Sequence, residues 1–462
     1  MSRLSVLVPV LLVGCAPTSY QAQPQQQALV TVQETPSGTD IWIGGSPVHT
    51  QVLVDGAGDT YVGVWVDAPN NIAVATERAP MAVSLVIDTS GSMAGDKIAN
   101  ARMAASSLLE TLSDGDVVSI YGFASGVTEI AQPTVLSAQN RSYLMQQINR
   151  LRALGGTNMW GGMQAGIQRM REAPASHPIR RIMLISDGQA NVGPSDPGSL
   201  GNLAAQATEW GTQITAIGVG LDYSEQTLAS LAVRSSGRLY HLEQSFQMAS
   251  ILERELQVLA NTVAVDAYIE VVPAPGVAIV EGMTMGSTLQ DNRLRIPLGS
   301  VFAGQHREVL FRARLDTARA GDRQLATARL VYRQPGENGQ HKTQAANVAY
   351  NVTGDRRAAS NSGAPRVQAM VANHSATKSQ LRAVQLMNEG RGEEAAREME
   401  QAEAQLSSAA SAAPAAPSSV QLRSRASSMK KSAKRARKAK SRSEQRGAAL
   451  DFNDDALEAE GY

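Results

Sequence analysis

The fold is decided by the stretch Ala82-Val83-Ser84-Leu85-Val86-Ile87-Asp88-Thr89-Ser90-Gly91-Ser92. Its first half is almost entirely apolar and predicts a strand that is buried on both faces. Similar apolar runs follow at 117–121, 182–185 and 214–217, and helical stretches such as 98–112 and 144–151 separate them. Buried strands that alternate with helices indicate an α/β unit with a mostly parallel central sheet. We place this unit at residues 81–258.

The second half of the stretch gathers oxygen donors where the first strand must end. Asp88, Ser90 and Ser92 lie within five residues of one another. Ligands of open α/β sheets bind at the carboxyl edge, and one carboxylate with two hydroxyls suits a small hard cation such as Mg²⁺. Asp, Ser and Gly also form ordinary turns and helix caps, so this motif by itself leaves both interpretations open.

Two later motifs occur in a matching structural context. A glycine-rich loop, Gly155-Gly156, presents Thr157, and the strand at 182–185 runs into Ser186-Asp187-Gly188. The order D-x-S-x-S, then Thr after two glycines, then S-D-G resembles the von Willebrand factor A domain and its metal-ion-dependent adhesion site. The resemblance covers residues 81–258 and implies a Rossmann-like α/β fold.

The resemblance also implies a role for each motif residue. Ser90 and Ser92 would ligate the ion directly, Thr157 would do so when a partner is bound, and Asp88 and Asp187 would act largely through water. The expected ion is Mg²⁺, with Ca²⁺ or Mn²⁺ as alternatives. A shell of hydroxyls and water leaves much of the ion's charge uncompensated, so the open position should attract an Asp or Glu carboxylate of a partner protein.

The segments around the α/β unit predict further domains. Residues 28–80 and 261–352 show short alternating apolar patterns and should form one β-sandwich that holds the inserted unit. Residues 353–406 predict a polar linker and a helical hairpin, which cannot bury its own face and must pack on something else. Residues 407–462 are rich in Ala, Ser and Pro, then basic, then acidic, and this composition predicts a disordered tail.

The first residues predict export and a lipid anchor. Arg3 precedes an apolar run from Leu4 to Val13 that is only half as long as a bilayer-spanning helix needs to be. Leu12-Val13-Gly14-Cys15 resembles the lipobox of bacterial lipoproteins, which implies a signal peptide at 1–14, an acylated Cys15 and a tether at 15–27. The residue after the cysteine is Ala16 rather than Asp, so we expect the outer membrane rather than the inner one.

Composition excludes several classes of function. The chain has 462 residues, 42 Lys and Arg, 42 Asp and Glu, and one cysteine, which excludes disulfide frameworks and zinc sites built from several cysteines. No nucleophile elbow, P-loop or zinc-protease motif occurs, and neither His177 nor His241 adjoins a motif loop, so we expect no enzyme. Aromatic residues make up 4% of the chain, and nucleic acid is not an expected partner of an exported protein.

The basic stretch at 421–446 allows two interpretations: a solvated tail, or a contact with anionic lipid or an envelope polymer. For the whole chain, two functions remain. In the first, an envelope lipoprotein binds a partner protein through the metal. In the second, the protein is an envelope scaffold or assembly factor, the metal stabilises the domain, and the helical hairpin and tail hold the partners. The oligomeric state stays open.

Overall fold

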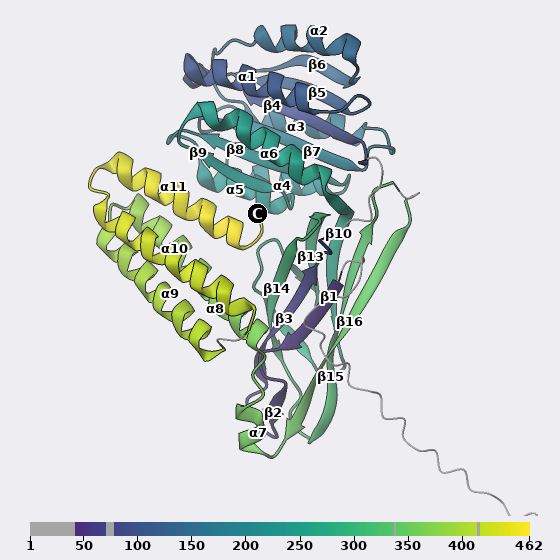
Figure 1. Ribbon diagram of the computed structural model, residues 1–462, viewed down its shortest axis with the longest axis vertical. Helices are drawn as coiled ribbons and strands as arrows, with labels where there is room; N and C mark the ends of the chain where they lie inside the picture. The colour runs from purple at the N-terminus through teal and green to yellow at the C-terminus, as the bar shows by residue number, and fades with distance from the viewer. Residues whose placement is uncertain (1–41, 71–77, 337–338, 414–415) are drawn as a thin grey trace, which may run out of the picture. The chain divides into compact units, whose positions relative to one another are not determined.

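The central α/β domain is built on one six-stranded sheet. The computed structural model describes residues 42–70, 78–336, 339–413 and 416–462 (Figure 1). The strand order is β6-β5-β4-β7-β8-β9, in which all neighbours are parallel except β6 and β5. The bounds are β4 (Met81–Asp88), β5 (Val117–Phe123), β6 (Val127–Val135), β7 (Ile179–Ser186), β8 (Thr212–Val219) and β9 (Arg238–Leu242).

Helices cover both faces of this sheet because alternate side chains of each strand point to opposite sides. Val83, Leu85 and Ile87 of β4 face α1 (Asp96–Thr111), α2 (Ala138–Asn149) and α6 (Met248–Ala260). Ala82 and Val86 face α3 (Met159–Arg171), α4 (Pro197–Thr208) and α5 (Glu225–Arg234). Two short 3₁₀ helices, η1 (Gly91–Met93) and η2 (Ser245–Gln247), complete the domain. The fold class predicted for this segment is confirmed.

The β-rich segments on either side of the α/β domain pair with each other. One sheet has the order β1-β3-β14-β11 and the other β12-β13-β10-β15-β16-β2, so both combine strands from before and after the insertion. The first contains β1 (Trp42–Pro47), β3 (Asp59–Asp67), β11 (Ala278–Gly282) and β14 (His306–Arg314). The second contains β2 (Gln51–Leu53), β10 (Thr262–Pro273), β12 (Thr288–Gln290), β13 (Arg293–Phe302), β15 (Gly321–Arg333) and β16 (His341–Thr353).

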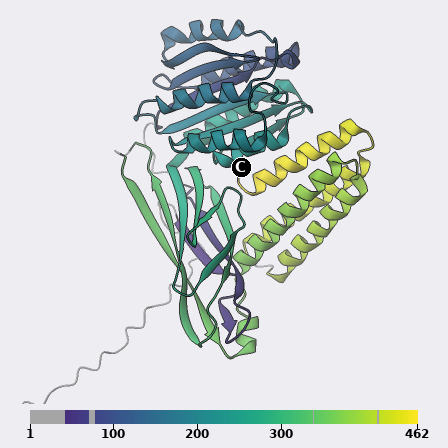
Figure 2. The same cartoon turned by 180° about the vertical axis from the view of Figure 1, so that it is seen from behind.

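Strand β3 fixes the relation between the two halves of this sandwich. It lies between β1 and β14, and it pairs antiparallel with β14 along its whole length, from Asp59↔Arg314 to Asp67↔His306. Apolar side chains of both sheets, among them Val64 and Phe311, form one buried cluster. The chain leaves the sandwich after β3 and returns to it through β10, as expected for an inserted domain (Figure 2).

The C-terminal part is helical throughout most of its length, which corrects one prediction. The expected hairpin corresponds to α8 (Pro365–Asn388) and α9 (Gly392–Ala412), but residues expected to be a disordered tail form α10 (Ser418–Lys438) and α11 (Arg442–Ala459). Apolar positions of α10, including Leu422, Met429 and Ala436, are buried against α8, α9 and α11. Most of its basic side chains are exposed, whereas Arg425 turns inward and donates a hydrogen bond to Thr377 of α8. The charged composition of α10 therefore conceals an amphipathic helix.

The helical bundle is also joined to the sandwich. Val367 and Met370 of α8 pack on Trp65 and Leu310 of the sheet β1-β3-β14-β11. Gly63 of β3 permits this contact, because a Cβ atom there would lie 2.7 Å from the sulfur of Met370. The linker expected at 353–365 includes a short helix, α7 (Arg356–Ser360). The predicted signal peptide, Cys15 and the tether lie outside the described residues.

Candidate metal centre

The two motif aspartates follow neighbouring parallel strands. Asp88 is the last residue of β4, and Asp187 comes directly after β7, whose Ile185 pairs with Ile87. Parallel strands end at the same edge of a sheet, so the pairing brings the two carboxylates together. The side chains of both aspartates are fully buried.

Hydroxyl groups connect the two carboxylates. Asp88 accepts hydrogen bonds from the Ser90 backbone N–H at 2.8 Å and from Ser186 Oγ at 2.6 Å. Ser92 Oγ donates to Asp187 Oδ1 at 2.8 Å and lies 3.0 Å from Ser90 Oγ. The 3₁₀ turn η1 places Ser90 and Ser92 on the same side, so the D-x-S-x-S sequence forms a compact group of oxygen atoms.

The glycine-rich loop joins this group through its backbone. The Gly91 N–H donates to the Gly155 carbonyl at 3.0 Å, and the Leu154 N–H donates to the Thr89 carbonyl at 2.8 Å. Gly155 has a φ of 84°, a backbone conformation that residues with a Cβ atom rarely adopt. The loop is thereby held against the end of β4, which brings Thr157 to the motif although it lies far from it in sequence.

Thr157 is 3% exposed, and its N–H donates to Asn191 Oδ1 at 2.8 Å. A Cβ atom added to Gly188 would lie 3.4 Å from Ser92 Oγ and 3.8 Å from Thr157 Oγ1. Both hydroxyls therefore lie beside the same glycine. The structure brings together all five residues that the sequence singled out in the α/β domain: Asp88, Ser90, Ser92, Thr157 and Asp187.

Charge at this edge is only partly compensated. The ammonium group of Lys97, on the first turn of α1, lies 2.5 Å from Asp187 Oδ2. Burial raises the pKa of Asp88 above its ordinary value, and hydrogen bonds from Ser186 and Ser90 offset part of that rise. A buried carboxylate whose charged form is disfavoured gains from a nearby cation.

The donor chemistry fits a hard divalent ion. Carboxylate and hydroxyl oxygens are ligands that Mg²⁺ and Ca²⁺ accept, and the set lacks the nitrogen and sulfur atoms preferred by zinc. Within the part of the chain that the structure describes, no three His, Cys, Asp or Glu side chains form a group able to hold a metal. A site at this edge would thus depend on the serine and threonine hydroxyls.

Two residues at the site have roles that the sequence motifs do not predict. Ser186 belongs to the S-D-G motif, and its hydroxyl donates a hydrogen bond to Asp88. Lys97, five residues after Ser92, falls on the first turn of the following helix, a position from which a lysine can reach the same edge. The two histidines of the domain have other partners: His177 Nε2 lies 2.8 Å from the Gly115 carbonyl oxygen, and His241 Nδ1 lies 3.1 Å from the Tyr223 hydroxyl.

Comparison with known proteins identifies the central domain. The family model of the von Willebrand factor type A domain matches residues 83–254. Residues 83–254 form a von Willebrand factor type A (VWA) domain. The match includes all five residues of the candidate metal centre and leaves out the sandwich and the helical bundle.

Curated relatives match part of the chain at modest identity. The chain is 26% identical over 271 residues to the uncharacterized protein sll0103 of Synechocystis, which covers 56% of this chain and 63% of that protein. It is 28% identical over 245 residues to the uncharacterized protein YfbK of Escherichia coli, covering 51% of this chain and 42% of that one. It is 30% identical over 188 residues to human inter-alpha-trypsin inhibitor heavy chain H4, and the match covers 39% of this chain and 20% of that one. The chain therefore spans less than two thirds of the length of these relatives.

Solved structures resemble more of the chain than the VWA domain. A von Willebrand factor type A protein from Catenulispora acidiphila superposes with a TM-score of 0.68 at 17% identity, covering 88% of this chain and 91% of that one. The ArnB paralog VWA2 from Sulfolobus acidocaldarius gives a TM-score of 0.60 at 17% identity, and the superposition covers 90% of this chain and 98% of that one. This likeness is one of fold.

Proposed function

We propose that this protein is a lipid-anchored envelope protein whose VWA domain binds a partner protein through a divalent cation. The ion, Mg²⁺ in the first instance and Ca²⁺ or Mn²⁺ as alternatives, would be held by Asp88, Ser90, Ser92, Thr157 and Asp187. The observation that carries the proposal is the meeting of these five side chains, from three separate segments, at the carboxyl edge of one sheet.

The donor set explains why such a site would bind a protein. Three of the five donors are neutral hydroxyls, so a divalent ion would keep much of its charge. An Asp or Glu carboxylate of the partner would complete its coordination. Leu154, which is 78% exposed and adjoins the glycine-rich loop, offers the partner an apolar contact beside the charged one. Among the described residues, the two histidines of the domain have partners away from this site.

The membrane attachment is proposed from the sequence. Acylation of Cys15 would provide the anchor, since two or more acyl chains are enough for stable attachment, and Ala16 favours the outer membrane. Among the described helices, none has the length and apolar character needed to cross a bilayer. The VWA domain would then face the periplasm or the cell surface at the end of the tether.

The second candidate is an envelope scaffold or assembly factor in which the metal is structural. The helical bundle favours it, because α10 and α11 add a long charged surface beside the VWA domain. In that case removal of the metal would lower thermal stability without changing partner capture.

Capture experiments distinguish these functions. The mature chain and Thr157→Val, which keeps β-branching but lacks the hydroxyl, are immobilised and exposed to envelope extract in Mg²⁺ or in chelator. We expect a protein retained by wild type in Mg²⁺ to be lost in chelator, and its affinity for Thr157→Val to fall about tenfold or more. Capture that is equal in all conditions would refute metal-mediated binding and favour the scaffold.

A further inference from the structure

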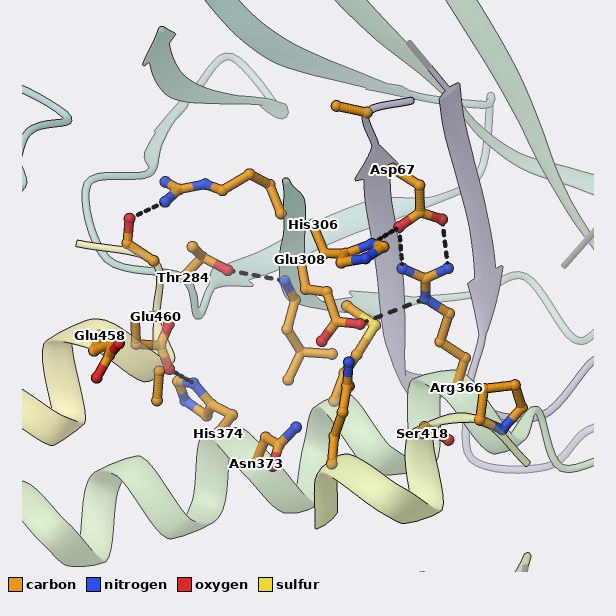
Figure 3. A pocket seen from close by; sticks show the side chains of 18 of the residues that line it. Asp67, Thr284, His306, Glu308, Arg366, Asn373, His374, Ser418, Glu458 and Glu460 are labelled. Carbon is orange, nitrogen blue, oxygen red and sulfur yellow. Dashed lines mark hydrogen bonds and ion pairs between the residues drawn. The ribbon is translucent and has the colours of Figure 1, made fainter. Parts of the chain in front are cut away.

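A cavity lies between the sandwich and the helical bundle, away from the VWA motif. It encloses about 730 Å³ and is lined by β3, β14, α8, the start of α10 and the end of α11. Figure 3 shows charged side chains from these elements around it, including Asp67, Glu308, Arg366, His374 and Glu460. None of the five residues of the candidate metal centre lines it. We call it the bundle pocket.

The cationic side chains of the bundle pocket already have partners. Arg366 donates two hydrogen bonds of 2.7 Å to Asp67 and lies 3.4 Å from Glu308 (Figure 3). Its guanidinium also stacks on the ring of Trp65. Arg307 donates to the Gly461 carbonyl and stacks on the ring of Tyr462. These guanidinium groups hold the walls together and leave few donors free to bind an anion.

Acceptors, in contrast, remain available. Glu460 is 11% exposed, and the ring atom His374 Nδ1 lies 3.7 Å from its carboxylate. Asn373 Oδ1 and His374 Nε2 are buried and have no hydrogen-bond partner among the described residues. Buried polar atoms without partners are uncommon in native proteins and point to a missing ligand or water.

Carboxylates also outnumber guanidinium groups among the side chains that line the bundle pocket. Four carboxylates line the bundle pocket (Asp67, Glu308, Glu458 and Glu460), against two guanidinium groups (Arg307 and Arg366) and the imidazoles of His306 and His374. Burial raises the pKa of Glu308 despite its contact with Arg366, and a second nearby cation would favour the charged form of this carboxylate. Apolar side chains, Leu310, Met370 and Pro365 among them, line another part of the wall.

We propose that the bundle pocket binds an alkylammonium group, that is, a protonated primary amine on an aliphatic stem. The ammonium would be held by Glu308, Glu460 and Asn373 Oδ1, and the stem would lie on Leu310 and Met370. A free diamine and the side chain of a lysine both carry this group. This proposal is independent of the metal centre.

Titration calorimetry on the mature chain tests it with two probes. 1,5-Diaminopentane represents the free amine, and Nα-acetyl-lysine methylamide represents the lysine side chain. We expect saturable binding of at least one of them and none of glutarate, which has a similar stem and the opposite charge. The probe that binds more tightly identifies the source. Saturable binding of neither amine would overturn the proposal, as would equal binding of glutarate.

Variants locate the binding. Glu308→Gln and Glu460→Gln remove one charge each at constant shape and should weaken amine binding about tenfold or more. Glu281→Gln, on β11 of the same sheet but outside the bundle pocket, should bind like wild type. Unchanged affinity in both pocket variants would overturn the proposed location.

One variant is expected to gain affinity. Asn373→Asp adds a carboxylate where an acceptor already lacks a partner, so amine binding should become tighter. This test does not depend on removing a contact from the folded protein. Equal or weaker binding by a folded Asn373→Asp would count against the alkylammonium site.

Discussion

Glu255 ties the last helix of the VWA domain to its sheet. It is fully buried on α6, and its carboxylate accepts hydrogen bonds from the Thr215 hydroxyl at 2.7 Å and the Tyr240 hydroxyl at 2.9 Å. Arg181 Nε lies 3.7 Å away and is also buried. Removal of one partner from such a pair leaves an uncompensated charge in the interior.

We therefore expect Glu255→Gln to lower the free energy of unfolding by about 3 kcal/mol. Glu253→Gln, an exposed change on the same helix, should alter it by less than about 0.5 kcal/mol. Urea unfolding of both variants provides the measurement. Equal urea midpoints for the two variants would show that the Glu255 carboxylate does not stabilise the buried charge of Arg181. The double variant Arg181→Met/Glu255→Leu should recover part of the loss.

Asp67 should make the stability of the sandwich depend on acid pH. Hydrogen bonds from Arg366 and His306 outweigh the effect of burial and lower its pKa to about 2, below its ordinary value of 3.8. The unfolded chain therefore takes up the proton first. Ionised Asp67 therefore adds about 2 kcal/mol to the free energy of unfolding. This contribution is complete at pH values above the ordinary pKa of the carboxyl and is lost as the pH falls towards 2.

Asp67→Asn should accordingly reduce the free energy of unfolding near neutral pH by at least about 2 kcal/mol. The difference in free energy of unfolding between wild type and Asp67→Asn, called the gap below, should narrow as the pH falls from about 4 to about 2. Denaturant unfolding at a series of pH values measures the gap. A gap that stays constant over this interval would mean that Asp67 keeps its ordinary pKa in the folded protein.

At the scale of elements, α10 shows why composition alone misled. Its buried residues Leu422, Ala426, Met429, Ala433 and Ala436 follow a helical spacing of three and four, but most are alanines separated by Ser, Lys and Arg. A seam made mainly of alanine contributes little to average hydrophobicity, although it packs closely between helices. A local signal did exist for α11, where Ser441 and Glu444 form a capping box.

Met429→Asp tests whether α10 is held by this seam. Burial of an unpaired charge costs several kcal/mol, so the variant should release the helix. Trypsin should then cleave within 418–438, where wild type resists, while Ser428→Asp on the exposed face should behave like wild type. Rapid cleavage of wild type in this segment would instead support the disordered tail that the composition predicts.

Other elements could be predicted because their patterns are local. The apolar strands of the VWA domain and the motifs at 88–92, 155–157 and 186–188 are all visible in short windows of sequence. The sequence predicts that the segments around the insertion share one sandwich, but it does not predict that β3 pairs with β14. These two strands are separated in sequence by the whole inserted domain. The role of Lys97 also depends on a tertiary contact, namely how α1 packs against the end of β7.

At the scale of the molecule, Arg446 joins the helical bundle to the VWA domain. Its guanidinium donates to the carbonyls of Leu221 and Tyr223 at 3.1 and 2.7 Å, and to Glu225 at 2.6 Å. The same loop begins at Gly220, where an added Cβ atom would lie 3.8 Å from Lys97 Nζ. A contact of the bundle thus lies near the candidate metal centre.

Arg446→Met keeps most of the aliphatic stem and removes these hydrogen bonds. We expect faster amide hydrogen exchange at 220–225 and at the start of α11, with no change in the sandwich strands. Arg442→Met, an exposed change one turn earlier in α11, is the matched control. Exchange at 220–225 that is the same in Arg446→Met as in wild type would show that this loop is held without the bundle.

The central claim is that Asp88 and its neighbours hold a divalent ion. Magnesium is titrated calorimetrically into metal-free wild type, Asp88→Ala and the exposed control Asp114→Ala. We predict saturable binding to wild type and to Asp114→Ala, and a loss of binding in Asp88→Ala, since only two carboxylates of the site offset the charge of the ion. Equal magnesium affinity in wild type and Asp88→Ala would contradict the claim.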